Sequence, residues 1–362
     1  MELTKQIADW IVGGEEPSKL DFRPDLSESR TIRREGTCSW IFNQPTFESW
    51  YEANTNTVAW YNAPPGSGKT ILSSAVVHHL EAQNCQVVYF RYSFDDNTRK
   101  KPLSALRSIA LQLRRIKGHI PDQVLVDYQK EVDHHAYHLQ DSETAAKVVE
   151  AFIKQSPRVH IIVDGLDECS DIGKVLEIFR RLVTFSTYGV TKWFFTSRDE
   201  PSIRSAMKEV NAMEICPSRG IIMNDIAIYL DSQGEKMAVR KCASCVRYWT
   251  AASEENFLYS KLMFDILCGE GVTCSDEIHE ELQKFPPGLK GCYMRCIENI
   301  THRPEREREL ARYVSHQPQK VLVFFFLISF IKTNLRLNGA CSTTSYCQRT
   351  AQCSCYHDRP TL

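Results

Sequence analysis

The sequence predicts an α/β fold: a parallel five-stranded sheet covered by helices on both faces. Short apolar runs alternate with helical patterns between residues 58 and 216. The runs are nearly unbroken, as expected of strands buried on both faces, and parallel strands need helical crossovers between them. The first run leads through a glycine-rich loop straight into a helix, an order typical of α/β domains.

The elements follow from residue type and period. β-branched and aromatic residues mark the strands, and a 3.6-residue apolar period marks the helices. The predicted strands are Val58–Tyr61, Gln86–Tyr92, Val159–Val163, Trp193–Thr196 and a weaker Met213–Cys216. The helices among them are predicted at about Gly68–Ala82, Leu103–Ile116, Pro121–Val132, Glu143–Gln155 and Ile172–Val183. Beyond residue 221 the pattern is purely helical, at about Ile221–Asp231, Glu254–Leu267, Asp276–Leu282 and Leu289–Ile300.

The chain is expected to divide into four segments. Residues 1–30 form an N-terminal helical or linker segment with a short amphipathic start, and residues 31–220 form the α/β domain. The stretch from Arg33 to Trp50 is rich in Trp and Phe and should pack on the sheet that follows it. Residues 221–312 are predicted to be a helical subdomain, and residues 313–362 an atypical apolar and cysteine-rich tail.

Composition favours an ordinary globular protein. Lys and Arg number 44 against 45 Asp and Glu, a net charge of −1, so nothing in the charge favours a nucleic-acid partner. The N-terminus lacks the basic start and apolar core of a signal peptide, so we expect a cytoplasmic protein whose fourteen cysteines are thiols. The apolar run Val321–Ile331 is shorter than the roughly 20 residues that span a bilayer, so no membrane span is predicted.

The stretch Ala63–Thr70 has the pattern of a phosphate-binding loop of Walker A type. Glycines let the backbone turn tightly around an anion, and the following helix adds the positive end of its dipole. The residues expected to hold the nucleotide are Gly66, Ser67, Gly68, Lys69 and Thr70. The alternative is a glycine turn that merely caps a helix.

Two residues of this loop have distinct expected roles. Lys69 would place its charge on the β- and γ-phosphates, and Thr70 would offer a hydroxyl to Mg²⁺. Ala63 stands where the usual pattern begins with Gly. If that position needs a positive φ, the alanine costs about 1–2 kcal/mol, which would weaken binding without abolishing it.

The third predicted strand ends in the acidic run Asp164-Gly165-Leu166-Asp167-Glu168. An acid at the carboxyl end of a buried parallel strand lies in the crevice where open α/β sheets bind ligands. Asp164 is therefore predicted to hold Mg²⁺ opposite Thr70, and either Asp167 or Glu168 to orient or deprotonate the attacking water. The alternatives are a capping aspartate and a solvated acidic pair at a helix start.

Arg198 follows the fourth predicted strand. If that strand lies beside the third, Arg198 comes near the γ-phosphate, where it would sense the nucleotide or stabilise transition-state charge. The alternative is a surface arginine paired with Asp199 or Glu200.

Taken together, these motifs resemble the NACHT nucleoside triphosphatases of the STAND class. The closer likeness is to fungal NACHT proteins of the heterokaryon-incompatibility and nephrocystin-like N-terminal type. It rests on Gly36 to Trp40, Pro65 to Thr70, Asp164 to Glu168, Thr196 to Arg198, Asn224 to Tyr229 and Phe285 to Leu289, and covers about residues 30–312.

The resemblance implies a sheet order of 5-1-4-3-2 and a P-loop NTPase that cycles between off and on states. It implies ATP or GTP with Mg²⁺ as cofactors, the nucleotide as partner and possible self-association, and it brings Gly36 and Thr37 near the base. The relatives continue into a winged helix and repeats, whereas the likeness ends near Arg312. We therefore expect a truncated module whose residues after about 313 are non-homologous.

Three functions remain open at this point. The leading one is a nucleotide-switched signalling protein that slowly hydrolyses ATP or GTP. The second is a nucleotide-binding scaffold without significant turnover. The third is a metabolic P-loop kinase, which is weaker because it leaves Asp167, Glu168 and Arg198 without a role.

Overall fold

A computed structural model describes residues 2–184, 189–234, 249–251, 253 and 256–269, together with residues 280 and 283. The predicted helices Asp276–Leu282 and Leu289–Ile300 fall almost entirely outside these residues. The predicted tail at 313–362 lies outside them as well.

Five parallel strands form one sheet in the order β2-β3-β4-β1-β5. The strands are β1 (Thr57–Asn62), β2 (Val87–Arg91), β3 (Arg158–Asp164), β4 (Val190–Ser197) and β5 (Met213–Ile215). Read from the other edge, this is the expected order 5-1-4-3-2, so the fold class and topology are confirmed. The order makes β4 the neighbour of both β1 and β3.

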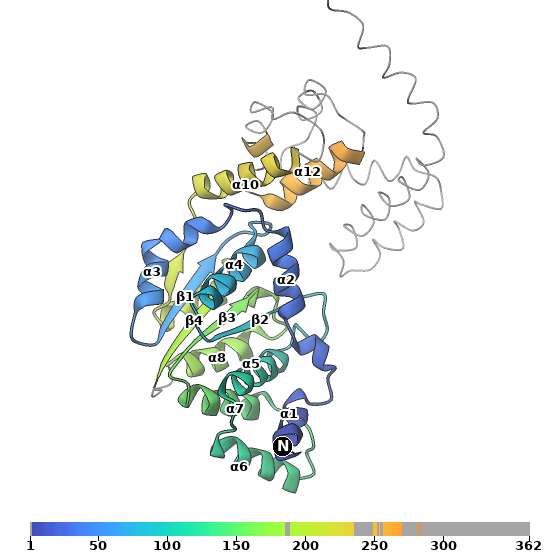
Figure 1. Cartoon of the computed structure of the whole chain (residues 1–362), viewed down its shortest axis with the longest axis vertical. Helices are drawn as coiled ribbons and strands as arrows, with labels where there is room; N and C mark the ends of the chain where they lie inside the picture. Colours follow the sequence, from blue (N-terminus) through green and yellow to red (C-terminus); the bar gives the residue numbers. More distant parts are fainter. Residues whose placement is uncertain are drawn as a thin grey trace, which may run out of the picture.

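Helices cover both faces of the sheet (Figure 1). One face carries α2 (Arg23–Ile32), α3 (Pro45–Glu52) and α4 (Lys69–Ala82). The other carries α5 (Pro102–Lys117), α7 (Ser142–Lys154), α8 (Ile172–Thr184) and α9 (Pro201–Glu209). This division is what right-handed crossovers require, because the chain crosses the sheet in one direction through α4 and returns through the others.

The remaining helices lie at the two ends of the molecule (Figure 1). α1 (Glu2–Val12) and α6 (Asp122–Asp133) pack beside α5 and α7. α10 (Arg219–Gly234) and α12 (Phe257–Gly269) lie together beyond the carboxyl ends of the strands. Single turns of 3₁₀-helix occur at η1 (Pro17–Leu20), η2 (Ser39–Asn43) and η3 (Leu166–Glu168).

The core explains why the strands are apolar throughout. Phe194 packs against Trp50 of α3, whereas its neighbours Trp193 and Phe195 pack against Phe179 of α8. Alternate side chains of β4 therefore enter opposite helical layers, and both faces of the sheet are dry. The expected packing of the segment from Arg33 to Trp50 on the sheet is confirmed, since Ile41, Phe47 and Trp50 are buried.

Three helices, α2, α3 and α9, are not among the predicted ones. Only Ser29 of α2 is fully buried, so this helix carries little hydrophobic signal. Helices α3 and α9 are short and begin at Pro45 and Pro201, a proline position that favours helix starts.

Helix α12 begins at Phe257, three residues later than predicted, because the Asn256 side chain accepts a hydrogen bond from the backbone N–H of Tyr259 and caps it.

Within the described residues, no helix has the length and apolar character needed to cross a membrane. Cys38, Cys85, Cys169 and Cys216 are free thiols.

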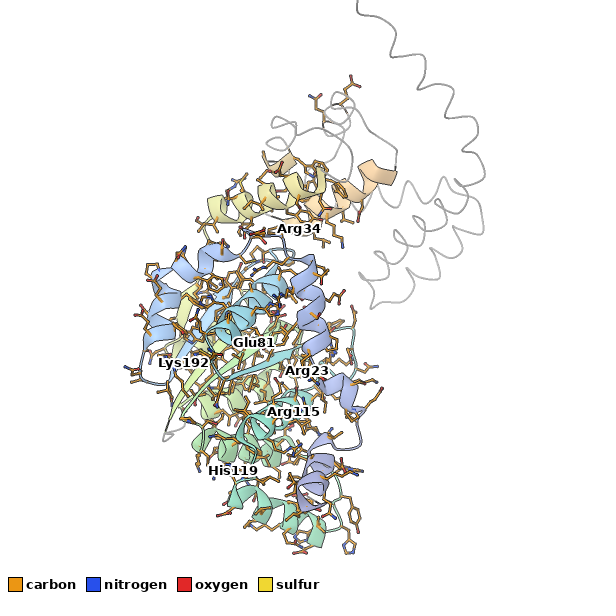
Figure 2. The ribbon with its side chains drawn as sticks, in the orientation of Figure 1. Arg23, Arg34, Glu81, Arg115, His119 and Lys192 are labelled. Atoms are coloured by element: carbon orange, nitrogen blue, oxygen red, sulfur yellow. The ribbon has the colours of Figure 1, made fainter. Side chains whose placement is uncertain are left out.

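Two ionisable side chains are buried at the end of the sheet away from the glycine-rich loop at 63–68. Lys192 of β4 (labelled in Figure 2) donates hydrogen bonds to the Trp50 carbonyl (2.7 Å) and the Thr57 hydroxyl (2.9 Å). Burial lowers the pKa of Lys192 to about 8. His160 of β3 is 1% exposed, and neither ring nitrogen has a hydrogen-bond partner in the described part of the chain. Burial, with the charges of Arg158 and Lys192, lowers the pKa of His160 to about 4.

We predict that His160 makes folding stability depend on pH. Between pH 6.5 and pH 4 the unfolded histidine binds a proton and the folded one does not, so the free energy of unfolding falls as the pH drops through this window. The loss amounts to at most about 3 kcal/mol. Urea unfolding of wild type and His160→Phe across this range should show the dependence in wild type and a flatter curve in the variant.

The control is His138→Phe, which alters an exposed histidine. It should keep the wild-type pH dependence. Parallel stability curves for wild type and His160→Phe would contradict the prediction.

Candidate nucleotide-binding site

The predicted site residues meet at one edge of the sheet. The loop at 63–68 follows β1, the run Asp164–Glu168 begins at the end of β3, and Arg198 follows β4. Because these strands are adjacent and parallel, their carboxyl ends lie side by side. The strand order thus brings together three motifs that are far apart in the sequence.

The glycine-rich loop has the conformation that its sequence suggests. Gly66 and Gly68 have φ values of 76° and 85°, a region that side chains with a Cβ disfavour. Ser67 is buried between them, and Thr70 lies in the first turn of α4. Ala63 has no positive φ, and its N–H donates to the Ser197 carbonyl at 3.2 Å. The cost in free energy that alanine would have at a position of positive φ therefore does not apply to Ala63.

Lys69 lies across the inside of this loop. Its Nζ donates to the carbonyl oxygens of Ala63 and Pro64, at 2.9 Å each. Burial lowers the pKa of Lys69, while the nearby carboxylates of Asp167 and Asp164 oppose that shift. The Lys69 ammonium is thus held against the start of the loop, near the carboxylates of the acidic run.

Asp164 is 1% exposed and its two oxygens have different surroundings. Oδ1 accepts a hydrogen bond from the Thr196 hydroxyl at 2.6 Å, and the same hydroxyl accepts one from the Gly165 N–H at 3.0 Å. Oδ2 has no hydrogen-bond partner among the described residues, and Arg91 Nε lies 3.9 Å from it. A buried carboxylate oxygen without a hydrogen bond fits the oxygen ligation that Mg²⁺ prefers. The Thr70 hydroxyl stays the second protein oxygen that the sequence predicts for the ion.

Asp167 and Arg198 form an ion pair. Arg198 Nε lies 3.0 Å from Asp167 Oδ2, and the Arg198 backbone N–H donates to Oδ1 at 3.0 Å. The Asp167 side chain is 3% exposed, whereas the Arg198 side chain is 51% exposed. The alternative partners of Arg198 were Asp199 and Glu200, but Asp199 pairs with Arg204 instead. Both oxygens of Asp167 are therefore used to hold the arginine.

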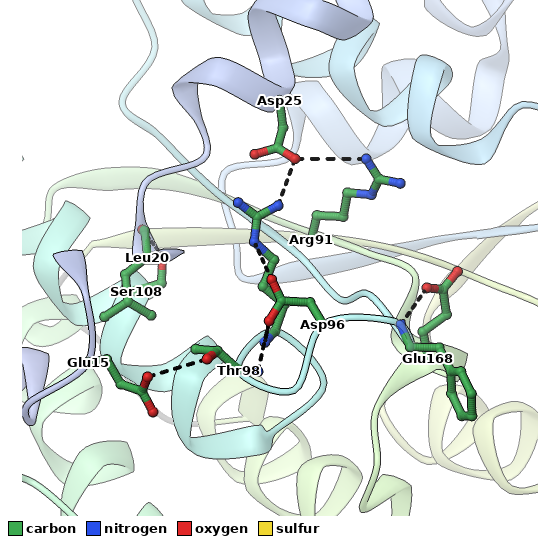
Figure 3. Close-up of polar contacts among 10 residues, drawn as sticks. Glu15, Leu20, Asp25, Arg91, Asp96, Thr98, Ser108 and Glu168 are labelled. Atoms are coloured by element: carbon green, nitrogen blue, oxygen red, sulfur yellow. Dashed lines mark hydrogen bonds and ion pairs between the residues drawn. The ribbon is translucent and has the colours of Figure 1, made fainter. Parts of the chain in front are cut away.

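Glu168 differs from its neighbour. Its Oε2 accepts a hydrogen bond from the Phe94 N–H at 3.1 Å, which fixes the side chain against the loop after β2 (Figure 3). Burial raises the pKa of Glu168, and the negative charges of Asp164 and Asp167 add to the effect. A carboxylate with a raised pKa is a stronger base than an ordinary one.

Gly36 lies next to α10, and Thr37 follows it in the chain. A Cβ on Gly36, whose φ is 87°, would stand 3.6 Å from Ile228 of α10. Just after them, the Cys38 N–H and the Trp40 indole N–H both donate to Asp225 Oδ2, at 2.8 and 3.1 Å. Asp225 thus ties this segment to α10. The role of Gly36 and Thr37 beside a base stays a prediction.

Helix α12 contacts the loop directly, a feature that the sequence does not reveal. The Phe257 N–H donates to the Gly66 carbonyl at 2.9 Å, and Asn256 Nδ2 donates to the Pro65 carbonyl at 3.1 Å. The local signal is limited to an asparagine before an apolar helix, which predicts a helix start but not its contact 191 residues away.

Gly66→Ala should be destabilising. The residue has a positive φ, and a Cβ there would meet Asn256 Oδ1 at 2.3 Å. We expect the conformational strain alone to lower the free energy of unfolding by about 1–2 kcal/mol. The matched control is Gly173→Ala in α8, where a Cβ meets nothing within 4 Å and alanine is the better helix former. Urea unfolding should rank the control at or above wild type and Gly66→Ala below it; the reverse order would be inconsistent with this loop geometry.

Comparison with known proteins supports the identification of the P-loop NTPase motifs. Residues 36–198 match the family model described as Nephrocystin 3, N-terminal. Vegetative incompatibility protein HET-E-1 of Podospora anserina is 24% identical over 287 residues, which cover 74% of this chain and 21% of that protein. The chain therefore spans about a fifth of the length of this curated relative.

Among solved structures, the Aeropyrum pernix ORC1 protein in complex with DNA is 12% identical, with a TM-score of 0.40 over 81% of each chain. Replication initiator DnaA bound to AMPPCP and single-stranded DNA is 10% identical, with a TM-score of 0.39 over 90% of this chain and 97% of that one. At these identities and TM-scores, the two structures do not support any functional assignment. The nucleotide-site assignment therefore rests on the family match and on the motifs. The match contains the loop at 63–70, the acidic run and Arg198, so residues 36–198 are similar to the nephrocystin 3 N-terminal family and carry the motifs of a P-loop NTPase of NACHT type.

Proposed function

We propose that this chain binds ATP or GTP with Mg²⁺ in the loop Gly66–Thr70 and acts as a slowly hydrolysing molecular switch. The observation that carries the proposal is the Asp164 carboxylate. It is buried beside the loop and has one oxygen without a hydrogen bond among the described residues. A buried anionic oxygen of this kind calls for a cation, and a nucleotide in the adjacent loop would bring one.

The loop supplies the proposed phosphate contacts. The backbone N–H groups from Gly66 to Lys69 would surround the phosphates at the start of α4, where the helix dipole favours negative charge. Lys69 would exchange its bonds to the Ala63 and Pro64 carbonyls for bonds to phosphate oxygens. Thr70 and Asp164 would hold Mg²⁺, which neutralises phosphate charge.

Of the two acids left open by the sequence, the geometry favours Glu168 as the group that orients or deprotonates water. Asp167 is occupied on both oxygens by Arg198. Glu168 has a raised pKa and is fixed by the Phe94 N–H through Oε2. We assign Asp167 the supporting role of holding Arg198, whose exposed guanidinium would reach toward the γ-phosphate.

A nucleotide-holding scaffold without significant turnover is the second candidate. The observation that favours it is the occupied Asp167 carboxylate, because hydrolysis then depends on Glu168 alone. The signalling role, self-association and a cytoplasmic setting come from the family resemblance and are part of the proposal. Sedimentation velocity with and without Mg-nucleotide tests the self-association, which requires a nucleotide-dependent increase in mass.

Lys69→Ala should weaken Mg-nucleotide binding. The variant loses charge-assisted hydrogen bonds to phosphate, each contributing about 1.5–3 kcal/mol, so affinity should fall by about 10- to 100-fold. Titration with fluorescent mant-ATP and mant-GTP measures the loss. Lys174→Ala, at an exposed lysine of α8, is the charge-matched control and should bind like wild type. Wild-type affinity in folded Lys69→Ala would refute the site assignment.

Glu168→Gln should keep nucleotide binding and lose hydrolysis. Removing a general base lowers the rate by about 10²–10⁴-fold, whereas the amide retains the shape of the side chain. Phosphate release under single-turnover conditions is the measurement, with Glu177→Gln on the exposed side of α8 as control. If Asp167→Asn abolished hydrolysis while Glu168→Gln did not, the roles given to the two acids would be wrong. A wild type that binds nucleotide without any turnover would favour the scaffold.

A further inference from the structure

An arginine lies between the N-terminal helix α2 and the proposed metal-binding aspartate. Arg91 is the last residue of β2 and the direct register neighbour of Asp164 on β3. Its Nε lies 3.9 Å from Asp164 Oδ2, the oxygen that has no hydrogen bond among the described residues. Its Nη1 lies 3.9 Å from Oδ1 of Asp25, which belongs to α2. One guanidinium therefore has two carboxylates within reach, of which Figure 3 shows that of Asp25.

Asp25 is well anchored on its own side. Its Oδ1 also accepts a hydrogen bond from Arg99 Nη1 at 2.7 Å. Arg99 in turn lies over the Phe22 ring, 4.6 Å from its centroid, and its Nε lies 3.6 Å from Asp96. The Asp25 side chain is 16% exposed, so its charge is only partly screened by water. The position of this carboxylate is set by the docking of α2 on the loop after β2.

The same loop contacts the acidic run. Its residue Phe94 donates the backbone N–H to Glu168, and Thr98 donates its hydroxyl to Glu15 Oε2 at 3.3 Å (Figure 3). The N-terminal segment thus reaches the nucleotide site by two routes. One route is electrostatic, through Arg91 to Asp164. The other is mechanical, through the loop to Glu168.

The charge of Arg91 affects cation binding at Asp164 in a definite direction. Arg91 is always protonated, so its charge close to Asp164 Oδ2 opposes the approach of another cation to the same oxygen. Asp25 offers Arg91 a second partner. When Asp25 holds the guanidinium, Asp164 is free to bind Mg²⁺, and without Asp25 the guanidinium pairs with Asp164 alone.

We propose that Arg91 is a positioning residue that competes with Mg²⁺ for Asp164, and that Asp25 relieves this competition, so that docking of α2 promotes Mg²⁺ binding. This inference rests on the Mg²⁺ site of the proposed function. Because coupling between two binding events is reciprocal, Mg²⁺ binding also strengthens the docking of α2.

The test is a Mg²⁺ titration of nucleotide binding, with mant-ATP and mant-GTP as probes in parallel. Asp25→Asn should raise the Mg²⁺ concentration for half-maximal binding by about fivefold or more, and Arg91→Met should lower it by a similar factor. The double variant should behave like Arg91→Met, because Asp25 acts only through Arg91. Glu28→Gln removes the same charge from an exposed position of α2 and should match wild type. Binding measured in EDTA should be similar in all five proteins.

Several outcomes would overturn the inference. One is an unchanged Mg²⁺ requirement in both single variants, with wild type still binding Mg-nucleotide; the proposed function then stands and only the coupling fails. Another is a full effect of Asp25→Asn in the Arg91→Met background, which would assign the effect to the loop and Glu168. A wild type that binds neither probe, with or without Mg²⁺, would reject the proposed function and this inference together.

A second measurement needs no variant that must fold. Amide hydrogen exchange of residues 23–32 in wild type should slow when Mg²⁺ is added to the nucleotide-bound protein. Exchange that is unaffected by Mg²⁺ would contradict the reciprocal coupling.

Discussion

The Asp164 carboxylate is almost completely buried at the end of β3, and the fold satisfies only part of its hydrogen-bonding capacity. Thr196 on β4 donates to one oxygen and holds the Gly165 N–H with the same hydroxyl. The other oxygen has a charge nearby, on Arg91 of β2, but no hydrogen bond within the described residues. Burying an anion in this way is costly unless a cation is at hand. The strands on both sides of β3 thus each contribute a residue, Thr196 or Arg91, to the surroundings of one carboxylate.

The surroundings of this carboxylate extend beyond the segment that carries the family match. Asp25 lies before residue 36, and Asn256 and Phe257 lie far beyond residue 198. The first lies near Arg91, which in turn lies near Asp164, and the other two contact the carbonyls of the glycine-rich loop. The loop and the acidic run are therefore held by parts of the chain that the motifs do not include. A nucleotide site built this way is suited to report its occupancy to its neighbours, since any change at the loop or at Asp164 alters contacts with α12 or α2.

The strands of the sheet and the positions of the motifs could be predicted from the sequence, and the reasons are physical. Strands buried on both faces produce unbroken apolar runs, and a glycine loop between a strand and a helix has few other uses. The adjacency of β3 and β4, which brings Arg198 to the site, came from the family resemblance. Asp167 and Glu168 could not be told apart, because the choice depends on what Arg198 and Phe94 contact. Arg91 and Asp25 were missed because charge at a strand end or on a polar helix has no distinguishing pattern. Their importance arises only from pairing across β2 and β3.

The central claim is that a metal-dependent nucleotide site exists at the ends of β1 and β3. Isothermal titration calorimetry of the folded chain with ATP and with GTP, each in Mg²⁺ and in EDTA, tests it most directly. The account predicts saturable binding of one nucleotide at a single site per chain, tighter with Mg²⁺ than in EDTA. Absence of binding by both nucleotides, or an affinity that is the same with and without Mg²⁺, would contradict it.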